Sequence, residues 1–339
     1  LFVGALSPAY AQTSASVIAD NLNHPWSVAF LPGGDFLVTE RRGNLLRISP
    51  SGEKTEISGV PDVVTGGQAG LFDVVLSPDF ARDSFVYLSY AGEGEDGSNT
   101  EVAHARLDLD TNALTDFQVI FRAEPKVSGK NHYGGRLLFT PDGTLFITLG
   151  DRYEYRDEAQ NPENHLGKIV RLKDGKTEIY SRGHRNVQGI ALQPGTVRIW
   201  THEHGARGGD EVNILKPGAN YGWPLVTYGV DYSGAIISSR QTAPGIEPPV
   251  VYWTPSIAPS GMAFYTGDSF PAWKGDLFVG ALAGQHLRRL DVEGDRIVGQ
   301  EVLLEGLGQR IRDVRMGPDG YLYILTDEDN GQLVRLREP

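Results

Sequence analysis

The chain has 339 residues, 40% of them apolar, which is enough to bury the core of one large domain or two medium ones. Its 42 glycines and 20 prolines indicate many turns but do not recur at the short fixed period of a fibrous protein. The formal net charge is −12 and no long run of Lys or Arg is present, which argues against nucleic acid as a partner.

Residues 1–11 are apolar, lack an initiator methionine and end in Ala9-Tyr10-Ala11, the small-x-small pattern of a signal-peptidase site. They predict the remnant of a secretory signal peptide and hence a periplasmic or secreted protein; a short apolar terminal strand is the alternative. No other stretch reaches the ~18 apolar residues of a membrane span, so we expect none. Because the chain has no cysteine, core packing or bound metal would have to stabilise an exported protein.

One hairpin pattern recurs six times along the chain. Each copy has a short strand of alternating apolar residues, a turn built from Pro, Asp or Gly, and a second strand rich in β-branched and aromatic residues. A further strand usually follows, as at residues 44–48 and 332–336. The copies cover residues 26–39, 71–89, 135–148, 189–200, 261–280 and 312–326.

The repeat spacing gives about 50 to 55 residues per unit, the size of one four-stranded propeller blade. No window shows a long 3.6-residue period, which disfavours alternating strands and helices. An open pair of β-sheets is the alternative, but it would not explain a sixfold repeat. The sequence therefore predicts an all-β protein, a single six-bladed β-propeller over residues 12–339, with ligands bound where loops converge on the central channel.

Five polar, glycine-rich segments adjoin the repeated hairpins, so in a ring they would project onto one face. The copies of the repeat differ mostly in these loops, and we expect the functional residues there. The segments are residues 66–70, 129–135, 182–189, 201–211 and 308–313.

Three arginines of these loops are candidate ligands for an anion, Arg185, Arg310 and Arg312. Arg310 and Arg312 are two positions apart and would share one face of a strand. Such a local cluster of guanidinium groups is what an acidic chain needs to bind an anionic cofactor. Surface or inter-blade salt bridges are the alternative role. Neutral hydrogen-bonding groups accompany the arginines at Gln68, Asn186 and His132.

His132 and Asp151 stand at the two ends of one predicted hairpin, so both side chains can reach the same face. A carboxylate bonded to one imidazole nitrogen fixes the tautomer and raises the basicity of the other nitrogen. The pair is therefore a candidate general base for an alcohol proton, with a hydrogen-bonded structural histidine as the alternative.

The segment 202–211 contains His202, Glu203 and His204, which suggests a zinc site. The two histidines are only two residues apart and no thiolate or third spaced histidine accompanies them, so zinc is disfavoured. Gly205, Ala206, Asp210 and Glu211 follow directly. Backbone carbonyls and carboxylates suit a hard cation, and calcium is the usual one in an exported protein.

Several ordered phrases resemble the soluble quinoprotein aldose sugar dehydrogenases, which are related to the soluble glucose and sorbosone dehydrogenases. The resemblance runs from about Asn23 to the C-terminus. Its most specific phrases are residues 24–30 (His-Pro-Trp-Ser-Val-Ala-Phe), 183–191 (Gly-His-Arg-Asn-Val-Gln-Gly-Ile-Ala), 209–214 (Gly-Asp-Glu-Val-Asn-Ile), 220–224 (Asn-Tyr-Gly-Trp-Pro) and 309–314 (Gln-Arg-Ile-Arg-Asp-Val).

The resemblance implies a six-bladed propeller that carries pyrroloquinoline quinone on its axial face. His132 would be the general base, Asp151 its orienting partner, and Arg185 a further catalytic group that polarises the quinone carbonyl together with calcium. The implied quinone site comprises Gln68, His132, Arg185, Asn186, Asp210, Arg310 and Arg312, with Asp210 supporting the calcium loop. The carbonyls of Gly205 and Ala206 would hold a catalytic calcium, and the Glu211 side chain and Tyr221 carbonyl a second, structural one.

One position departs from the family pattern. The family commonly has a lysine that contacts the quinone in the loop after residues 277–280, and this chain has Ala283 there. Gln285, His286 or Arg288 could take the place of that lysine.

The resemblance implies oxidation of an aldose at its anomeric carbon, with hydride transfer to the quinone and a lactone as product. No Cys-x-x-Cys-His haem motif is present, so we expect an external electron acceptor. We also expect a monomer or weak dimer. The rival functions are a calcium-dependent propeller lactonase or other hydrolase, and a non-enzymatic propeller that binds a glycan or a protein.

Overall fold

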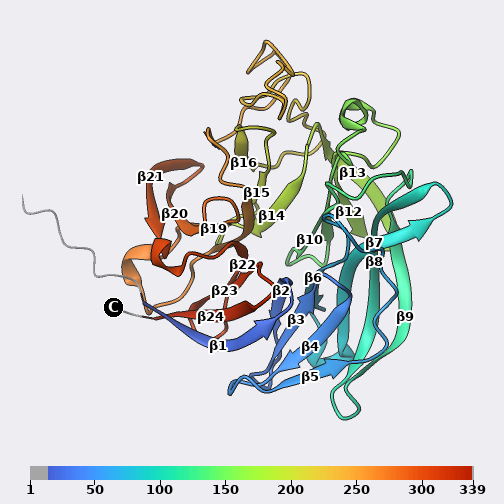
Figure 1. The fold of residues 1–339 in the computed structure, drawn as a ribbon, viewed down its shortest axis with the longest axis vertical. Helices are drawn as coiled ribbons and strands as arrows, with labels where there is room; N and C mark the ends of the chain where they lie inside the picture. The colour runs from blue at the N-terminus through green and yellow to red at the C-terminus, as the bar shows by residue number, and fades with distance from the viewer. Residues whose placement is uncertain (1–13, 338–339) are drawn as a thin grey trace, which may run out of the picture.

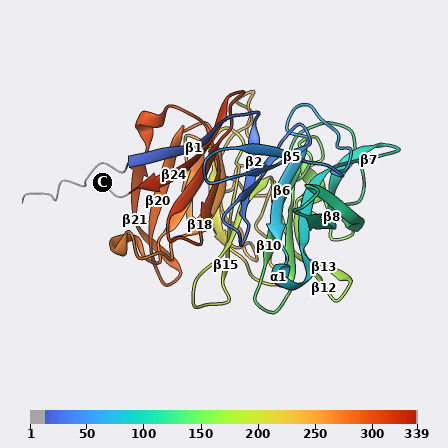
Figure 2. The same ribbon diagram turned by 90° about the horizontal axis from the view of Figure 1, so that it is seen from below.

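The computed structural model describes residues 14–337 and shows six four-stranded antiparallel sheets arranged around a central axis (Figure 1). The prediction of a six-bladed β-propeller is confirmed. Seen from the side, the sheets stand next to one another and the connecting loops form the two faces (Figure 2). The predicted signal-peptide remnant, residues 1–11, lies outside the described residues.

Each blade runs outward from the axis in chain order. The first blade consists of β2 (Pro25–Phe30), β3 (Phe36–Glu40), β4 (Asn44–Ile48) and β5 (Lys54–Ile57). The second consists of β6 (Leu71–Leu76), β7 (Phe85–Gly94), β8 (Gly97–Asp108) and β9 (Ala113–Arg122). The third consists of β10 (Gly134–Phe139), β11 (Leu145–Leu149), β12 (Lys168–Lys173) and β13 (Lys176–Arg182).

Blades four and five follow the same order, and the sixth takes three strands from the end of the chain. The fourth blade consists of β14 (Val187–Leu192), β15 (Ile199–Glu203), β16 (Asp210–Ile214) and β17 (Val251–Trp253). The fifth consists of β18 (Pro259–Phe264), β19 (Leu277–Ala281), β20 (His286–Glu293) and β21 (Arg296–Leu303). The sixth contains β22 (Ile311–Met316), β23 (Leu322–Thr326) and β24 (Gly331–Arg337).

The six predicted hairpins are the first two strands of the six blades, so the repeat copies were located correctly. Helix is confined to one turn of α-helix, α1 (Phe80–Asp83), and to three short 3-10 turns at Arg156–Gln160, Pro271–Trp273 and Glu305–Leu307 in the described chain. Among residues 14–337, no helix is both long and apolar enough to cross a membrane.

The N-terminal strand β1 (Ser14–Leu22) closes the ring, which the repeat analysis did not anticipate. It pairs antiparallel with β24 as the outer strand of the last blade, with Ser14 opposite Arg337 and Val17 opposite Val334. One sheet therefore contains both ends of the described chain, and backbone hydrogen bonds from β1 cover the outer edge of β24.

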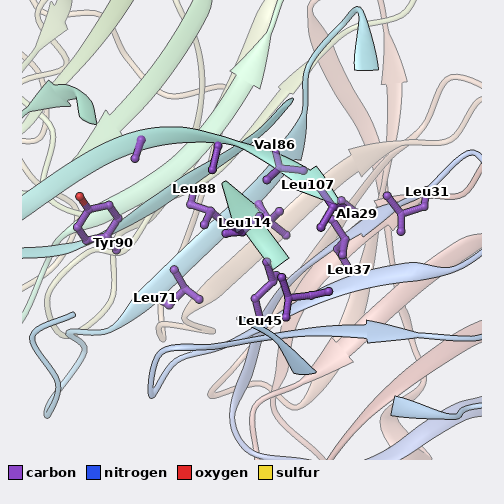
Figure 3. Close-up of a cluster of buried hydrophobic side chains, with 14 residues drawn as sticks. Ala29, Leu31, Leu37, Leu45, Leu71, Val86, Leu88, Tyr90, Leu107 and Leu114 are labelled. Atoms are coloured by element: carbon purple, nitrogen blue, oxygen red, sulfur yellow. The ribbon is translucent and has the colours of Figure 1, made fainter. Parts of the chain in front are cut away.

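Apolar side chains fill the spaces between neighbouring blades. Figure 3 shows the cluster between the first two blades, where Leu37 and Leu45 of the first face Leu71 and Val86 of the second. All four are fully or almost fully buried. Because each blade buries both faces against its neighbours, the ring is a rigid support for the loops on its faces.

A buried ionic network connects the inner strands across the axis. Arg136 donates through Nη1 to Asp313 (2.7 Å) and through Nη2 to the Arg312 carbonyl (2.8 Å). Arg315 bonds Asp73 at 2.6 Å and Asp313 at 2.9 Å. Burial lowers the pKa of Arg136 to about 10, while the two carboxylates favour its charged form. The network joins β6, β10 and β22 and fixes the backbone beneath the site.

Candidate functional site

A hollow of about 210 Å³ lies on the face formed by the five polar segments, and each of these segments contributes to its wall. It is called the first hollow below. Its walls include arginine, amide and aromatic side chains but no Asp or Glu. The lining residues are Trp26, Arg41, Gln68, Phe72, Tyr133, Gly134, Asn186, Gln188, His204, Ala258, Leu282, Arg310 and Arg312.

Three aromatic rings form an apolar side of the first hollow. The ring centroids of Trp26 and Phe72 are 5.4 Å apart, and those of Phe72 and Tyr133 are also 5.4 Å apart. The Arg136 guanidinium of the ionic network lies 4.0 Å from the Trp26 ring centroid and holds that ring from below. Planar walls of this kind suit a flat conjugated ligand.

Three guanidinium groups supply positive charge to the first hollow. As predicted, Arg310 and Arg312 face the same way, since both line the first hollow. Arg312 is anchored by Asp327, and its Nη1 also reaches Gln188 (3.2 Å) and Ser260 (3.3 Å). Arg312 thus makes a buried salt bridge within the last blade, neither at the surface nor between blades, and it still lines the hollow. The Arg310 guanidinium has no carboxylate partner among the described residues.

The third arginine, Arg41, was not predicted. It follows β3 in the first blade, and its Nη1 lies 3.9 Å from Asp327. Burial lowers its pKa, and Arg312, Arg310 and Arg42 lower it further, while Asp327 opposes them. The adjacent pair Arg41-Arg42 at the end of a repeat hairpin was the available sequence signal, although such pairs are common on protein surfaces.

The predicted amide groups are placed at the same hollow. The Gln68 Oε1 accepts a hydrogen bond from the His132 backbone (2.8 Å), and the Asn186 Oδ1 accepts one from the Gly134 backbone (3.2 Å). Gly134 has φ of +68°, a conformation that glycine adopts without strain. These contacts link the loops before β6, β10 and β14 directly to the hollow.

His132 and Asp151 form the predicted pair. The imidazole Nδ1 lies 2.6 Å from Asp151 Oδ1, and the second carboxylate oxygen accepts from the Trp223 indole at 2.7 Å. His132 is only 4% exposed and has φ of 54°, an uncommon conformation for a residue other than glycine. The surrounding bonds hold both side chains in fixed positions, as a catalytic pair requires.

The protonation states of the pair suit a general base. Burial lowers the pKa of His132, and the charges of Arg185 and Arg152 add to this, against the opposing effect of Asp151. Burial opposes ionisation of Asp151, but His132, Arg185 and a hydrogen bond from the Tyr153 backbone hold its pKa below the ordinary value. The imidazole is therefore neutral at pH 7, with an ionised carboxylate beside it.

A second hollow of about 420 Å³ lies next to the pair: His132 and Asp151 line neither hollow, but Trp223, which donates to Asp151, lines the second. Tyr153 connects the second hollow to the pair, since its ring packs edge-on against His132 with the centroids 5.2 Å apart. Aromatic and charged side chains of both signs form its walls. They are Tyr153, Glu154, Arg156, Asp157, Arg185, Trp223, Asp231 and Tyr232, together with Ala206 and Ile237.

Arg185 lines this second hollow and not the first. Its guanidinium carbon lies 5.3 Å from the Trp223 ring and 5.8 Å from the Tyr232 ring. Nη1 donates to the carbonyls of Gly205 and, at 3.3 Å, His204, while the buried Nε has no hydrogen-bond partner among residues 14–337. A buried donor without a partner is available to a ligand.

The predicted calcium loop is tightly held by Asp210. This buried carboxylate accepts from the backbone nitrogens of Gly205 (2.8 Å), Ile257 (2.7 Å) and Ala258 (2.9 Å). It lines neither hollow, so its contribution in this structure is to position the loop. His202 and His204 each donate through Nε2 to a backbone carbonyl.

Glu211, which is half-buried, lies next to the buried Glu203. Burial, together with the charge of Glu203, raises the pKa of Glu211 to about 8. The two carboxylates and Tyr221 border a small cavity of about 10 Å³, the space of one water or ion. Within residues 14–337, no three His, Asp or Glu side chains are grouped so that they could hold a metal.

Comparisons with known proteins identify the family of the chain. The family model described as glucose/sorbosone dehydrogenase matches residues 22–335. The chain belongs to this family. The predicted resemblance is thereby confirmed.

Individual members of the glucose/sorbosone dehydrogenase family cover nearly the whole chain. Aldose sugar dehydrogenase YliI of Escherichia coli is 46% identical over 98% of this chain and 95% of its own length. The apo-form structure of the soluble E. coli aldose sugar dehydrogenase is 44% identical with a TM-score of 0.93, covering 97% of this chain and all of that one. A PQQ-bound aldose sugar dehydrogenase from Streptomyces coelicolor is 29% identical, covers 96% and 99%, and has a TM-score of 0.80.

The structure shows what surrounds Ala283, the residue that departs from the expected family pattern. The backbone nitrogen of Ala283 donates to the Ile257 carbonyl, and its neighbour Leu282 lines the first hollow. The alternatives Gln285, His286 and Arg288 do not line it. His286 bonds the Gly284 carbonyl, and Arg288 reaches Gln300, so both are directed elsewhere. The additional cation at the hollow is Arg41.

Proposed function

We propose that this glucose/sorbosone dehydrogenase family member is a dehydrogenase that uses pyrroloquinoline quinone to oxidise aldose sugars at the anomeric carbon to lactones. The observation that carries the proposal is the first hollow, whose wall has three arginines, three aromatic rings and no carboxylate, beside the His132–Asp151 pair. Such a wall suits a planar ligand with several carboxylates.

Different residues of the first hollow would hold different parts of that cofactor. Arg41, Arg310 and Arg312 would bind its carboxylates, Gln68 and Asn186 would bond its ring substituents, and the aromatic rings would pack on its plane. When bound, pyrroloquinoline quinone supplies an acceptor for a hydride.

His132 performs the proton transfer in this proposal. Its Nδ1–H donates a hydrogen bond to the Asp151 carboxylate, which leaves the Nε2 lone pair free to take the proton of the anomeric hydroxyl. As that proton leaves, the anomeric C–H bond breaks and its hydrogen departs as a hydride with the electron pair. The anomeric C–O bond then becomes the carbonyl of the lactone. Asp151 keeps the imidazole oriented and stabilises the imidazolium.

The second hollow is the proposed approach for the sugar. Aromatic faces next to carboxylates and arginines bind a polyol through its apolar C–H face and its hydroxyl groups. Tyr153, Tyr232 and Asp157 supply these groups, and the Tyr153 ring packs against His132. Arg185, with its unpaired Nε, would stabilise negative charge that develops during the transfer.

Calcium is part of the proposal at two places. The Gly205 and Ala206 carbonyls would hold a catalytic ion, which requires the Arg185 guanidinium to release the Gly205 carbonyl. A structural ion at Glu211 and the Tyr221 carbonyl would offset the repulsion between Glu211 and Glu203, which is otherwise relieved by protonation.

Reconstitution tests the whole proposal. Purified cofactor-free protein is mixed with pyrroloquinoline quinone and calcium, and reduction of an artificial dye is followed with glucose as substrate. Sugar-dependent reduction that needs both additions supports the proposal. Hydrolysis of a lactone with no electron acceptor would support the hydrolase alternative, and absence of both activities and of quinone binding would support a binding propeller.

A further inference from the structure

A third surface feature next to the first hollow is not used by the proposed chemistry. It is a groove of about 480 Å³ lined by His24, Arg41, Arg42, the segment 65–67 and Ala69. Arg41 lines both the groove and the first hollow, so the two spaces share one wall. The groove is called the basic groove below.

The charged side chains that line the basic groove are all basic. Arg42 is exposed and has no ion pair in the described part of the chain. Lys130 lies at the rim, where its Nζ donates to the Thr65 carbonyl at 2.6 Å, and it too has no carboxylate partner there. Arg310 and Arg312 are close enough to lower the pKa of Arg41 through their charges.

The acidic groups near the basic groove lie behind it or at its edge. Asp327 is 4% exposed and already engages Arg312 and His24. Asp329 is exposed and bonds His24 Nε2 at 3.0 Å, while Glu328 accepts from the Arg310 backbone. Apart from His24, whose ring is bonded to Asp327 and Asp329, the charged side chains that line the groove are therefore Arg41 and Arg42, in a chain whose formal net charge is −12.

We propose that the basic groove binds the external electron acceptor of this enzyme and that this acceptor is a small anion. The inference rests on the proposed function, since it assumes that electrons leave from the first hollow. Concentrated positive charge on an otherwise acidic protein attracts an anion to one place and raises its association rate. Binding at the wall shared through Arg41 would bring the acceptor next to the cofactor pocket.

The overall reaction balances with an acceptor of this class. The aldose loses two electrons and two protons as it becomes a lactone, and two molecules of a one-electron anionic acceptor are each reduced by one electron. The two protons pass to water. Ferricyanide, a trivalent anion, serves as the probe, and the N-methylphenazonium cation serves as the comparison dye.

The variant Arg42→Glu tests the groove because Arg42 lines it without lining the first hollow. We expect the second-order rate constant for ferricyanide at low salt to fall about 10-fold, and the rate with N-methylphenazonium to stay equal or rise. In ~1 M salt, where the screening length is about 3 Å, the ferricyanide effect should largely disappear. Lys130→Glu, at the rim, should act in the same direction.

Arg198→Glu is the matched control, because Arg198 is exposed in the turn between β14 and β15, at the end of that hairpin away from Asn186. It makes the same charge change and should leave both dyes unaffected. Calorimetry with ferrocyanide and cofactor-free protein gives a readout without turnover, in which Arg42→Glu should weaken binding and Arg198→Glu should not.

Equal slowing of both dyes by Arg42→Glu, or equal effects of Arg42→Glu and Arg198→Glu, would overturn the proposal. So would a ferricyanide rate that is insensitive to salt, or unchanged ferrocyanide binding in both groove variants. Failure of the proposed function is a separate result, since it would show as no sugar-dependent turnover with either dye, whatever the outcome of the ferrocyanide titration.

Discussion

The two hollows that adjoin the His132–Asp151 pair are built from different chemistry. The first has three arginines and no carboxylate in its wall, whereas the second combines Glu154, Asp157 and Asp231 with two arginines and three aromatic side chains. In a strongly acidic chain, the charged side chains of the first hollow are thus all basic, whereas those of the second are of both signs. The difference indicates that each hollow can be altered separately.

The largest effect should follow from replacing His132, the proposed base next to both hollows. We expect His132→Asn to lower kcat by about 10²- to 10⁴-fold, the usual contribution of a general base, with quinone binding retained. Asn tolerates the positive φ of this position better than Ala does, so the fold is less disturbed. Steady-state kinetics and a quinone titration check this.

His104→Ala in β8 is the control for that variant and should keep full activity. Turnover by His132→Asn close to that of the unmodified protein, with quinone bound, would remove His132 from the mechanism.

Changing the first hollow alone should affect cofactor binding. Arg310→Gln removes a charged donor that has no carboxylate partner in the described chain, so no buried acid is left unpaired. Loss of one charge-assisted hydrogen bond, about 1.5 to 3 kcal/mol, should raise the dissociation constant for pyrroloquinoline quinone about 10- to 100-fold. A spectroscopic titration measures it. The sugar KM at saturating cofactor should not move, and Arg198→Gln should change neither value.

Changing the second hollow alone should affect the sugar. Tyr232 is 56% exposed and lines that hollow, so Tyr232→Ala should leave the cofactor affinity unchanged and raise the KM for glucose about 2- to 10-fold, the value of one aromatic contact. Phe117→Ala, an exposed ring in β9, is the control. If Tyr232→Ala weakened quinone binding instead, the proposed division between the hollows would be wrong.

The smallest effect concerns pH. Because the folded protein holds the pKa of His132 below its ordinary value of 6.5, the imidazole stays mostly neutral at pH 6.5. The sugar-oxidation rate at pH 6.5 should therefore exceed half of its value at pH 7.5 and fall only below that pH. A rate that has already dropped below half at pH 6.5 would mean that the base titrates at or above its ordinary pKa.

Much of the architecture could be predicted from the sequence because each blade repeats the same local signals. Strand alternation and Pro-Asp-Gly turns act over a few residues, so six hairpins could be located without knowing how they pack. Closure of the ring by β1 could not be found this way, because it joins Val17 to Val334 across the whole chain.

The site residues likewise fall into those whose grouping could be predicted from the sequence and those whose placement only the structure shows. The order of residues placed Arg310 with Arg312 and paired His132 with Asp151, since each pair belongs to one strand or one hairpin. Only the tertiary structure brought Arg41 from the first blade to the first hollow, assigned Arg185 to the second, and left Asp210 behind the loop that it supports. Contacts between distant blades depend on the ring geometry and the packing of all six sheets, and no local sequence pattern encodes them.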